Sequence, residues 1–246
     1  MLIILLFNKT MSHLLLSIVF SIGFLFESIF GFGGGIVSYS ILAFFYDIKD
    51  LVVVAMYVGT ISTLIILVTS LKHIKIKLIF SSIPFIMCGV AVGTLCFKYI
   101  PSGILIKIYS ITLILISLRA LLFKELSLPA SASKAILTVG GFIQGVLGIG
   151  GPFFVVGLKS VISDKTILRA NLAVLFLLAN IYRYIQMVSS NIIEWNYFIK
   201  YWFIIIPVIF ALWLGYLIHK KIPQHAFDKF IYAGILISAV GFLILF

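Results

Sequence analysis

The sequence predicts an all-α integral membrane protein that forms a single membrane domain over residues 1–246. The first observation is composition: 63% of the residues are hydrophobic and 10% are charged, whereas soluble domains are about 45–50% apolar and about 25% charged. The second is that the apolar residues form runs of about 20, the length of a membrane-spanning helix. The third is that glycines interrupt two of these runs in the same pattern.

Six apolar runs have the length of complete spans. They are residues 51–71, 78–97, 104–122, 168–189, 197–218 and 229–246. Two further apolar stretches, Leu14–Tyr46 and Ala135–Leu158, contain clustered glycines. Because a glycine costs a helix about 1 kcal/mol relative to alanine, these two stretches are predicted to be broken helices.

The two broken stretches follow one pattern. The first reads "GFLFESIFGFGGG" from Gly23, and the second reads "GGFIQGVLGIGGP" from Gly140. At an offset of 117 residues, Glu27 aligns with Gln144. The pattern predicts a tandem duplication, joined by a segment rich in Pro, Ser and charged residues. The expected division is repeat one, 12–123; linker, 124–133; and repeat two, 134–246.

The distribution of basic residues discriminates between two topologies, because loops rich in Lys and Arg stay in the cytoplasm. If both glycine stretches cross the membrane there are eight spans, and the basic segments 72–77 and 219–229 lie on opposite sides. If each stretch enters and leaves on one side, three spans per half invert the second repeat and both segments become cytoplasmic. The favoured arrangement is therefore an inverted tandem repeat with six spans, two re-entrant or broken segments and both termini outside. Eight spans is the alternative.

The broken stretches are also the candidate binding site. Irregular backbone at membrane depth is tolerated where protein buries it or water reaches it. A half-helix that starts there presents free N–H groups and a partial positive charge, which bind anions. We expect two such starts, near Gly33–Ile36 and Gly150–Phe153, to face each other, although close helix packing is another use of such glycines. The expected binding positions in the two breaks are Gly33, Gly34, Gly35, Gly150, Gly151 and Pro152.

Arg183 lies inside the apolar run "LLANIYRYIQMV". A charge within a span costs a few kcal/mol unless it faces protein or water. Asn180 and Gln186 lie three residues to either side and share part of its helix face. We expect Arg183 to anchor an anion with both amides as neutral donors, and the alternative is that Arg183 snorkels to the interface.

Glu27 is a carboxylate well inside an apolar stretch. Burial favours its neutral form, so we expect it to carry a coupling proton or to pair with Arg183. Its repeat partner Gln144 cannot ionise, which makes any proton role one-sided. Capping of a half-helix is an equally favoured role for Glu27.

The chain resembles the TauE/SafE family of sulfite and organosulfonate exporters over nearly its whole length. The resemblance lies in "GFGGG", in "GVLGIGGPFFVV", and in the paired segments "IPFIMCGVAVGTLCFKYIP" and "IPVIFALWLGYLIHKKIP". It implies transport of small sulfur-containing anions, such as sulfite or sulfonates, or of related carboxylates. Because the second motif has Gly150-Gly151-Pro152 where the first has three glycines, the two half-sites should differ.

Together these features predict a secondary transporter or permease for small anions. An enzyme is not expected, because an enzyme should supply clustered His, Cys or acidic residues and the sequence shows no such cluster. We expect alternating access driven by protons or the membrane potential. An anion channel and a non-transporting membrane subunit are the alternatives. No cofactor or metal is expected. No nucleic acid is expected either, because orientation in the bilayer explains the formal net charge of +11. The expected partners are a small anion and the lipid bilayer of a prokaryotic plasma membrane, and a homodimer is left open.

Overall fold

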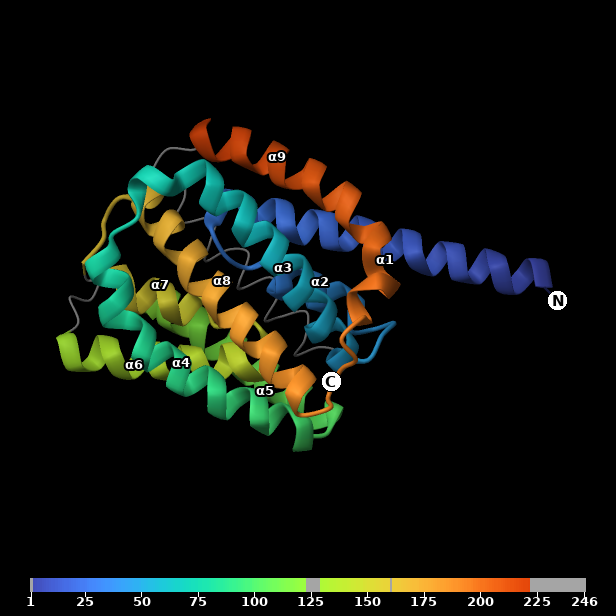
Figure 1. Ribbon diagram of the computed structural model, residues 1–246, viewed down its shortest axis with the longest axis horizontal. Helices are drawn as coiled ribbons and strands as arrows, with labels where there is room; N and C mark the ends of the chain where they lie inside the picture. The colour runs from blue at the N-terminus through green and yellow to red at the C-terminus, as the bar shows by residue number, and fades with distance from the viewer. Residues whose placement is uncertain (1, 123–128, 160, 222–246) are drawn as a thin grey trace.

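The computed structural model describes residues 2–122, 129–159 and 161–221 (Figure 1). These residues form helices and connecting turns, with no strand among them. The helices are α1 Leu2–Phe30, α2 Gly34–Leu42, α3 Ile48–Ser70, η1 Leu71–His73, α4 Ile76–Tyr99, α5 Ser102–Leu122, α6 Ala130–Leu147, α7 Gly151–Lys159, α8 Lys165–Ser189, η2 Tyr197–Ile204 and α9 Ile205–Lys221.

Six of the described segments are long and apolar enough to cross a membrane, as a multi-pass membrane protein requires. They are His13–Phe30, Ile48–His73, Ile76–Tyr99, Ala130–Leu147, Lys165–Ser189 and Tyr197–Lys221. Four of the six match expected spans. The expected span 104–122 falls on α5, and the expected span 229–246 lies outside the described residues.

The other two spanning segments lie in the glycine stretches, each of which folds into a long helix followed by a short one. In the first stretch α1 is followed by α2, and in the second α6 is followed by α7. Each short helix has nine residues and so rises about 14 Å, roughly half of the hydrocarbon core. Each short helix packs back against its long partner, so both stretches are hairpins with one long and one short arm.

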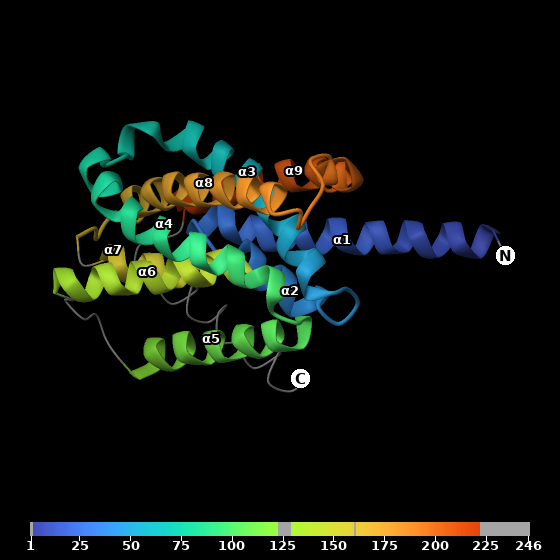
Figure 2. The same cartoon turned by 60° about the horizontal axis from the view of Figure 1, so that its bottom comes forward.

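The two hairpins enter the molecule from opposite ends. In Figures 1 and 2, α1 runs inward from the right, whereas α6 runs inward from the left. The turns of both hairpins therefore lie inside the molecule. This arrangement is the one expected of an inverted repeat, although the inversion of the complete second half and the division at 124–133 stay predictions.

Packing between the halves is reciprocal. The long arm α1 packs against α9, the long arm α6 packs against α4, and α3 packs against α8. Each hairpin is thus held by a helix from the other half of the chain. Gly89 and Gly93 of α4 face Gly141 and Gly145 of α6, and a Cβ atom on any of the four would overlap backbone of the facing helix. These glycines serve close helix packing, the alternative considered for the glycine clusters.

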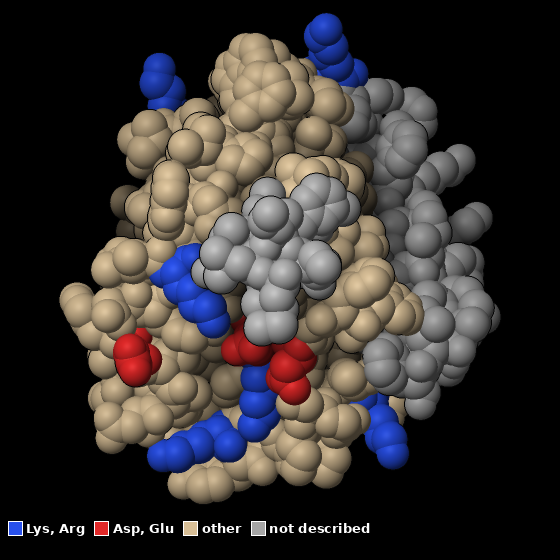
Figure 3. Space-filling model, turned by 90° about the vertical axis from the view of Figure 1, so that its right-hand side faces the viewer, with Lys and Arg blue, Asp and Glu red and all other residues tan. Residues whose placement is uncertain are grey.

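The charged side chains are divided between the two ends of the molecule. At the left end of Figure 1 lie η1, the starts of α4, α6 and α8, and the ends of α7 and α9. These segments carry Lys72, Lys75, Lys77, Lys134, Lys159, Lys165, Lys220 and Lys221. The right-hand end shows acidic side chains among a few basic ones (Figure 3).

Candidate functional site

Both hairpin turns are built on glycines in the left-handed region. Gly31 and Gly33 have φ of 89° and 102°, and Gly148 has φ of 73°. L side chains rarely adopt these angles, which explains the glycines at these positions. The N–H of Gly31 donates to the carbonyl of Glu27 at 2.6 Å, and the N–H of Gly148 donates to the carbonyl of Gln144 at 2.9 Å. Helices α1 and α6 therefore end in the same way, at aligned positions.

The short helices also begin in the same way. Glu27 Oε2 accepts a hydrogen bond from the Gly34 N–H at 3.2 Å, and Gln144 Oε1 accepts one from the Gly150 N–H at 2.8 Å. Glu27 and Gln144 thus cap the start of the second arm in each hairpin. The N–H groups that they accept from are one position apart in the alignment, because Gly34 aligns with Gly151. The capping role considered for Glu27 is realised in the structure. An uncharged amide makes the same contact in the second hairpin, so a negative charge is not needed for capping.

Helix α8 places a buried arginine against the end of each long arm. Arg169 Nε donates to the Ser28 carbonyl at 2.8 Å, and Arg183 Nε donates to the Gly145 carbonyl at 3.2 Å. Ser28 and Gly145 are themselves aligned at the offset of 117 residues. A cation beside the last carbonyls of a helix is favourable, because these carbonyls carry partial negative charge.

Arg169 was not among the predicted site residues. It is the second residue of the expected span 168–189, so the sequence places it at the very end of that span. The helix begins earlier, at Lys165, so Arg169 lies one turn inside it and is only 2% exposed. The available signal was its position within the apolar run, since a loop arginine would lie before the run.

Arg183 differs from Arg169 in having unused donors. Its side chain is fully buried, with 0% exposure, yet neither Nη1 nor Nη2 has a hydrogen-bond partner among the described residues. The expected ion pair with Glu27 is therefore not formed. Buried donors without partners are costly, and the cost is greater for a charged group. A Cβ atom at Gly148 would lie 3.1 Å from Nη1, so the guanidinium rests against the second hairpin turn.

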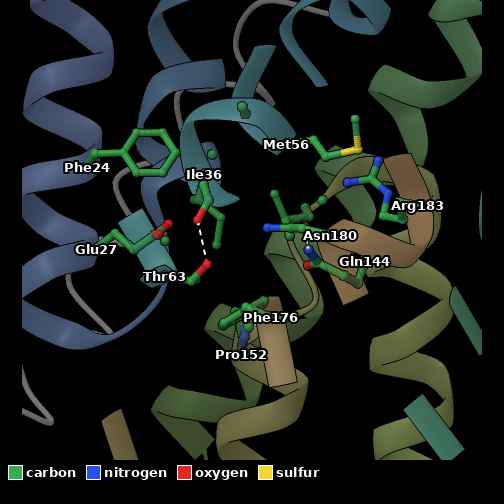
Figure 4. A pocket seen from close by; sticks show the side chains of 17 residues that line it. Phe24, Glu27, Ile36, Met56, Thr63, Gln144, Pro152, Phe176, Asn180 and Arg183 are labelled. Carbon is green, nitrogen blue, oxygen red and sulfur yellow. Dashed lines mark hydrogen bonds between the residues drawn. The ribbon is translucent and has the colours of Figure 1, made fainter. Parts of the chain in front are cut away.

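A cavity lies between the two hairpin turns (Figure 4). The first hairpin contributes Gly33 and Gly35, and the second contributes Gly148, Gly151 and Pro152. The cavity offers about 30 Å³ to the centre of a water-sized sphere. One water needs about 10–15 Å³ by this measure, so the cavity fits a group of only a few non-hydrogen atoms.

Polar side chains face this cavity from opposite sides. Figure 4 shows Glu27 on one side and Arg183 on the other, with Asn180 beside Gln144. Asn180 Oδ1 accepts a hydrogen bond from Gln144 Nε2 at 3.2 Å. Thr63 of α3 also lines the cavity and was not among the predicted residues.

Three predicted binding residues do not line the cavity. Gly34 and Gly150 do not line it, and their N–H groups donate to Glu27 Oε2 and Gln144 Oε1. The Gln186 side chain does not line the cavity, and its Nε2 donates to the Ala91 carbonyl of α4 at 2.9 Å. The cavity therefore brings together Arg183, Asn180 and both turns, but not Gln186.

Comparison with known proteins gives one kind of match. The protein-family model described as "Sulfite exporter TauE/SafE" matches residues 15–242, which include both hairpin turns and both buried arginines. Neither a curated protein nor a solved structure matches the chain.

Proposed function

The chain belongs to the sulfite exporter TauE/SafE family of membrane transporters, and we propose that it carries a small anion through the cavity between its two hairpin turns. The anion is sulfite or a similarly small sulfonate or carboxylate. The observation that supports this most strongly is Arg183, which is fully buried beside the cavity with Nη1 and Nη2 unpartnered. A bound oxyanion would supply the missing acceptors.

The chemistry of the lining fits an oxyanion. The two terminal nitrogens of a guanidinium bind two oxygens of one anion side by side, which a lysine cannot do. The starts of α2 and α7 add partial positive charge at the two hairpin turns. Asn180 lines the same cavity and can donate from its amide nitrogen.

The size of the cavity favours the smallest members of this substrate class. A cavity with room for only a few non-hydrogen atoms suits a compact anion such as sulfite better than a sulfonate with a long organic group. Larger substrates would require the two hairpins to move apart.

Transport would follow from movement of one half of the chain against the other. Hairpins with interrupted helices around a central site are typical of secondary transporters that work by alternating access. The basic end of the molecule would face the cytoplasm of a prokaryotic cell, and the physiological direction would be export. Protons, the membrane potential or both would provide the driving force.

Binding and counterflow together test this proposal. The purified protein should be stabilised against heat by sulfite, and proteoliposomes loaded with sulfite should accumulate labelled sulfite by exchange. Arg183→Ala should abolish both effects. Gln186→Ala is the matched control, because it removes a polar side chain from the same helix without altering the cavity, and it should retain both.

Two outcomes would contradict the proposal. If neither sulfite nor a panel of small sulfonates and carboxylates stabilises the protein or supports exchange, the cavity is not a transport site. Fast anion flux without counterflow would instead indicate a channel.

A further inference from the structure

We propose that Glu27 takes up one proton when an anion binds beside Arg183, so that proton and anion cross the membrane together. This inference rests on the proposed function and adds the identity of the coupling ion. It is drawn from the position of one carboxyl group in the cavity and from its uncharged counterpart in the other hairpin.

The first step concerns why residue 27 is a glutamate. Its contact with the Gly34 N–H caps α2, but Gln144 makes the equivalent contact to Gly150 with a neutral amide, and the distance is shorter, 2.8 Å against 3.2 Å. Capping alone is therefore met by an amide. A carboxyl group at this position adds one property that an amide lacks, which is the ability to bind and release a proton.

The second step concerns charge in the cavity. Among the described residues that line it, Glu27 and Arg183 are the two with an acidic or a basic side chain. With both ionised, the cavity walls are neutral in sum. A bound anion adds a negative charge close to Glu27 in a small space away from water, where like charges repel strongly. A proton on Glu27 removes this repulsion and restores neutrality.

The third step concerns the other ionisable groups around Glu27. Arg169 of α8 faces the end of α1 through the Ser28 carbonyl, and His219 of α9 contacts the Ile29 carbonyl through Nδ1. Tyr39 of α2 donates its hydroxyl to the Leu147 carbonyl. None of the three lines the cavity. Helix α3 contributes the non-ionisable Thr63 to the lining and the non-ionisable Ser62 beside the Glu27 side chain. Glu27 is thus the carboxyl group placed to respond to the anion.

The proton has a suitable atom to occupy. Oε2 accepts the Gly34 N–H, so the proton is placed on Oε1. The capping contact then survives in both protonation states, and α2 keeps its start position throughout the cycle. For a monovalent anion the loaded carrier gains no net charge, so cotransport of the anion with one proton is electroneutral.

The test compares sulfite binding in the wild type and in Glu27→Gln between about pH 5.5 and 7.5. In the wild type the affinity should rise as the pH falls, by up to tenfold per unit beyond any change caused by protonation of sulfite itself. In Glu27→Gln this extra dependence should be lost, because an amide cannot take up a proton. Protonation of sulfite itself is common to both proteins, so it does not contribute to the difference between them. Gln144→Glu, the matched reverse change, should make the dependence steeper.

A second measurement is independent of any variant. Infrared difference spectra of the wild type should show the C=O stretch of a protonated carboxylic acid when sulfite is added. Identical pH dependence in wild type and Glu27→Gln, or no carboxylic acid signal on binding, would overturn proton coupling and leave the proposed function standing. An absence of sulfite binding at every pH would instead overturn the proposed function.

Discussion

Replacing the two buried arginines of α8 by methionine should have opposite effects on stability. Arg183→Met removes two unpartnered donors, Nη1 and Nη2, and one hydrogen bond, from Nε to Gly145. Each unsatisfied donor costs about 1–3 kcal/mol, and the lost charged hydrogen bond contributes about 1.5–3 kcal/mol. The balance is a stabilisation centred near 2 kcal/mol. Replacement of a buried charge by an apolar side chain of similar length is often stabilising.

Arg169→Met should do the reverse. Its Nε bond to the Ser28 carbonyl is shorter, at 2.8 Å, and its Nη1 lies 3.5 Å from Ser70 Oγ. Loss of the first bond alone costs about 1.5–3 kcal/mol. The two variants should therefore differ by about 4 kcal/mol, which corresponds to about 8–16 °C in Tm for a chain of this size.

The assay is thermal unfolding of each purified protein in detergent, in a buffer whose anion is too large for the cavity. Addition of sulfite should raise the Tm of the wild type and leave the Tm of Arg183→Met unchanged. A fall in Tm for Arg183→Met as large as that for Arg169→Met would refute the reasoning, because Arg183 would then be a structural residue like Arg169.

Three further predictions concern the hairpin turns and their packing. Gly148→Ala should destabilise the protein by about 1–2 kcal/mol, because it forces alanine to a φ of 73°. It should also weaken sulfite binding, because the methyl group lies 3.1 Å from Arg183 Nη1. Thermal unfolding measures the first effect and sulfite titration measures the second. Gly93→Val should prevent folding, because the added side chain would overlap the backbone of α6. Gly103→Ala is the control and should be neutral, because a Cβ atom there has no described neighbour within 4 Å. The yields of folded protein are compared by gel filtration. Tyr39→Phe should lower the free energy of unfolding by about 1 kcal/mol, since it leaves the Leu147 carbonyl without its 3.1 Å hydrogen bond; chemical denaturation would contradict this if the loss were absent.

The positions of the two breaks were predictable because their cause is local. Glycine clusters at an offset of 117 residues predicted half-helix starts near Gly33–Ile36 and Gly150–Phe153, and the helices begin at Gly34 and Gly151. Backbone with positive φ favours glycine whatever lies around it, so clustered glycines in a sequence predict such turns without knowledge of the tertiary structure. The resemblance to the TauE/SafE family, carried by the same glycine motifs, agrees with the family match.

The geometry around Arg183 was only partly predictable, and the helix itself explains why. Residues three positions apart are separated by about 300° around a helix, which places Asn180 and Gln186 about 60° to either side of Arg183 and about 120° from each other. A small cavity cannot be reached from both directions. Asn180 lines the cavity, whereas Gln186 contacts α4.

Contacts between distant segments were not predictable from the sequence. The bond from Arg169 to Ser28 joins residues 141 positions apart, and no local pattern marks it. The packing of α6 on α4 also depends on how the two halves meet. Glycines four residues apart on both helices indicate close helix packing but do not identify the partner helix.

The most direct measurement is a structure of the protein with selenite, a heavier analogue of sulfite whose selenium is located by anomalous scattering. The proposal predicts one selenium peak between the starts of α2 and α7, with selenite oxygens within about 3.2 Å of Arg183 Nη1 and Nη2. A selenium peak at another site, or bound selenite that leaves both nitrogens unpartnered, would contradict it.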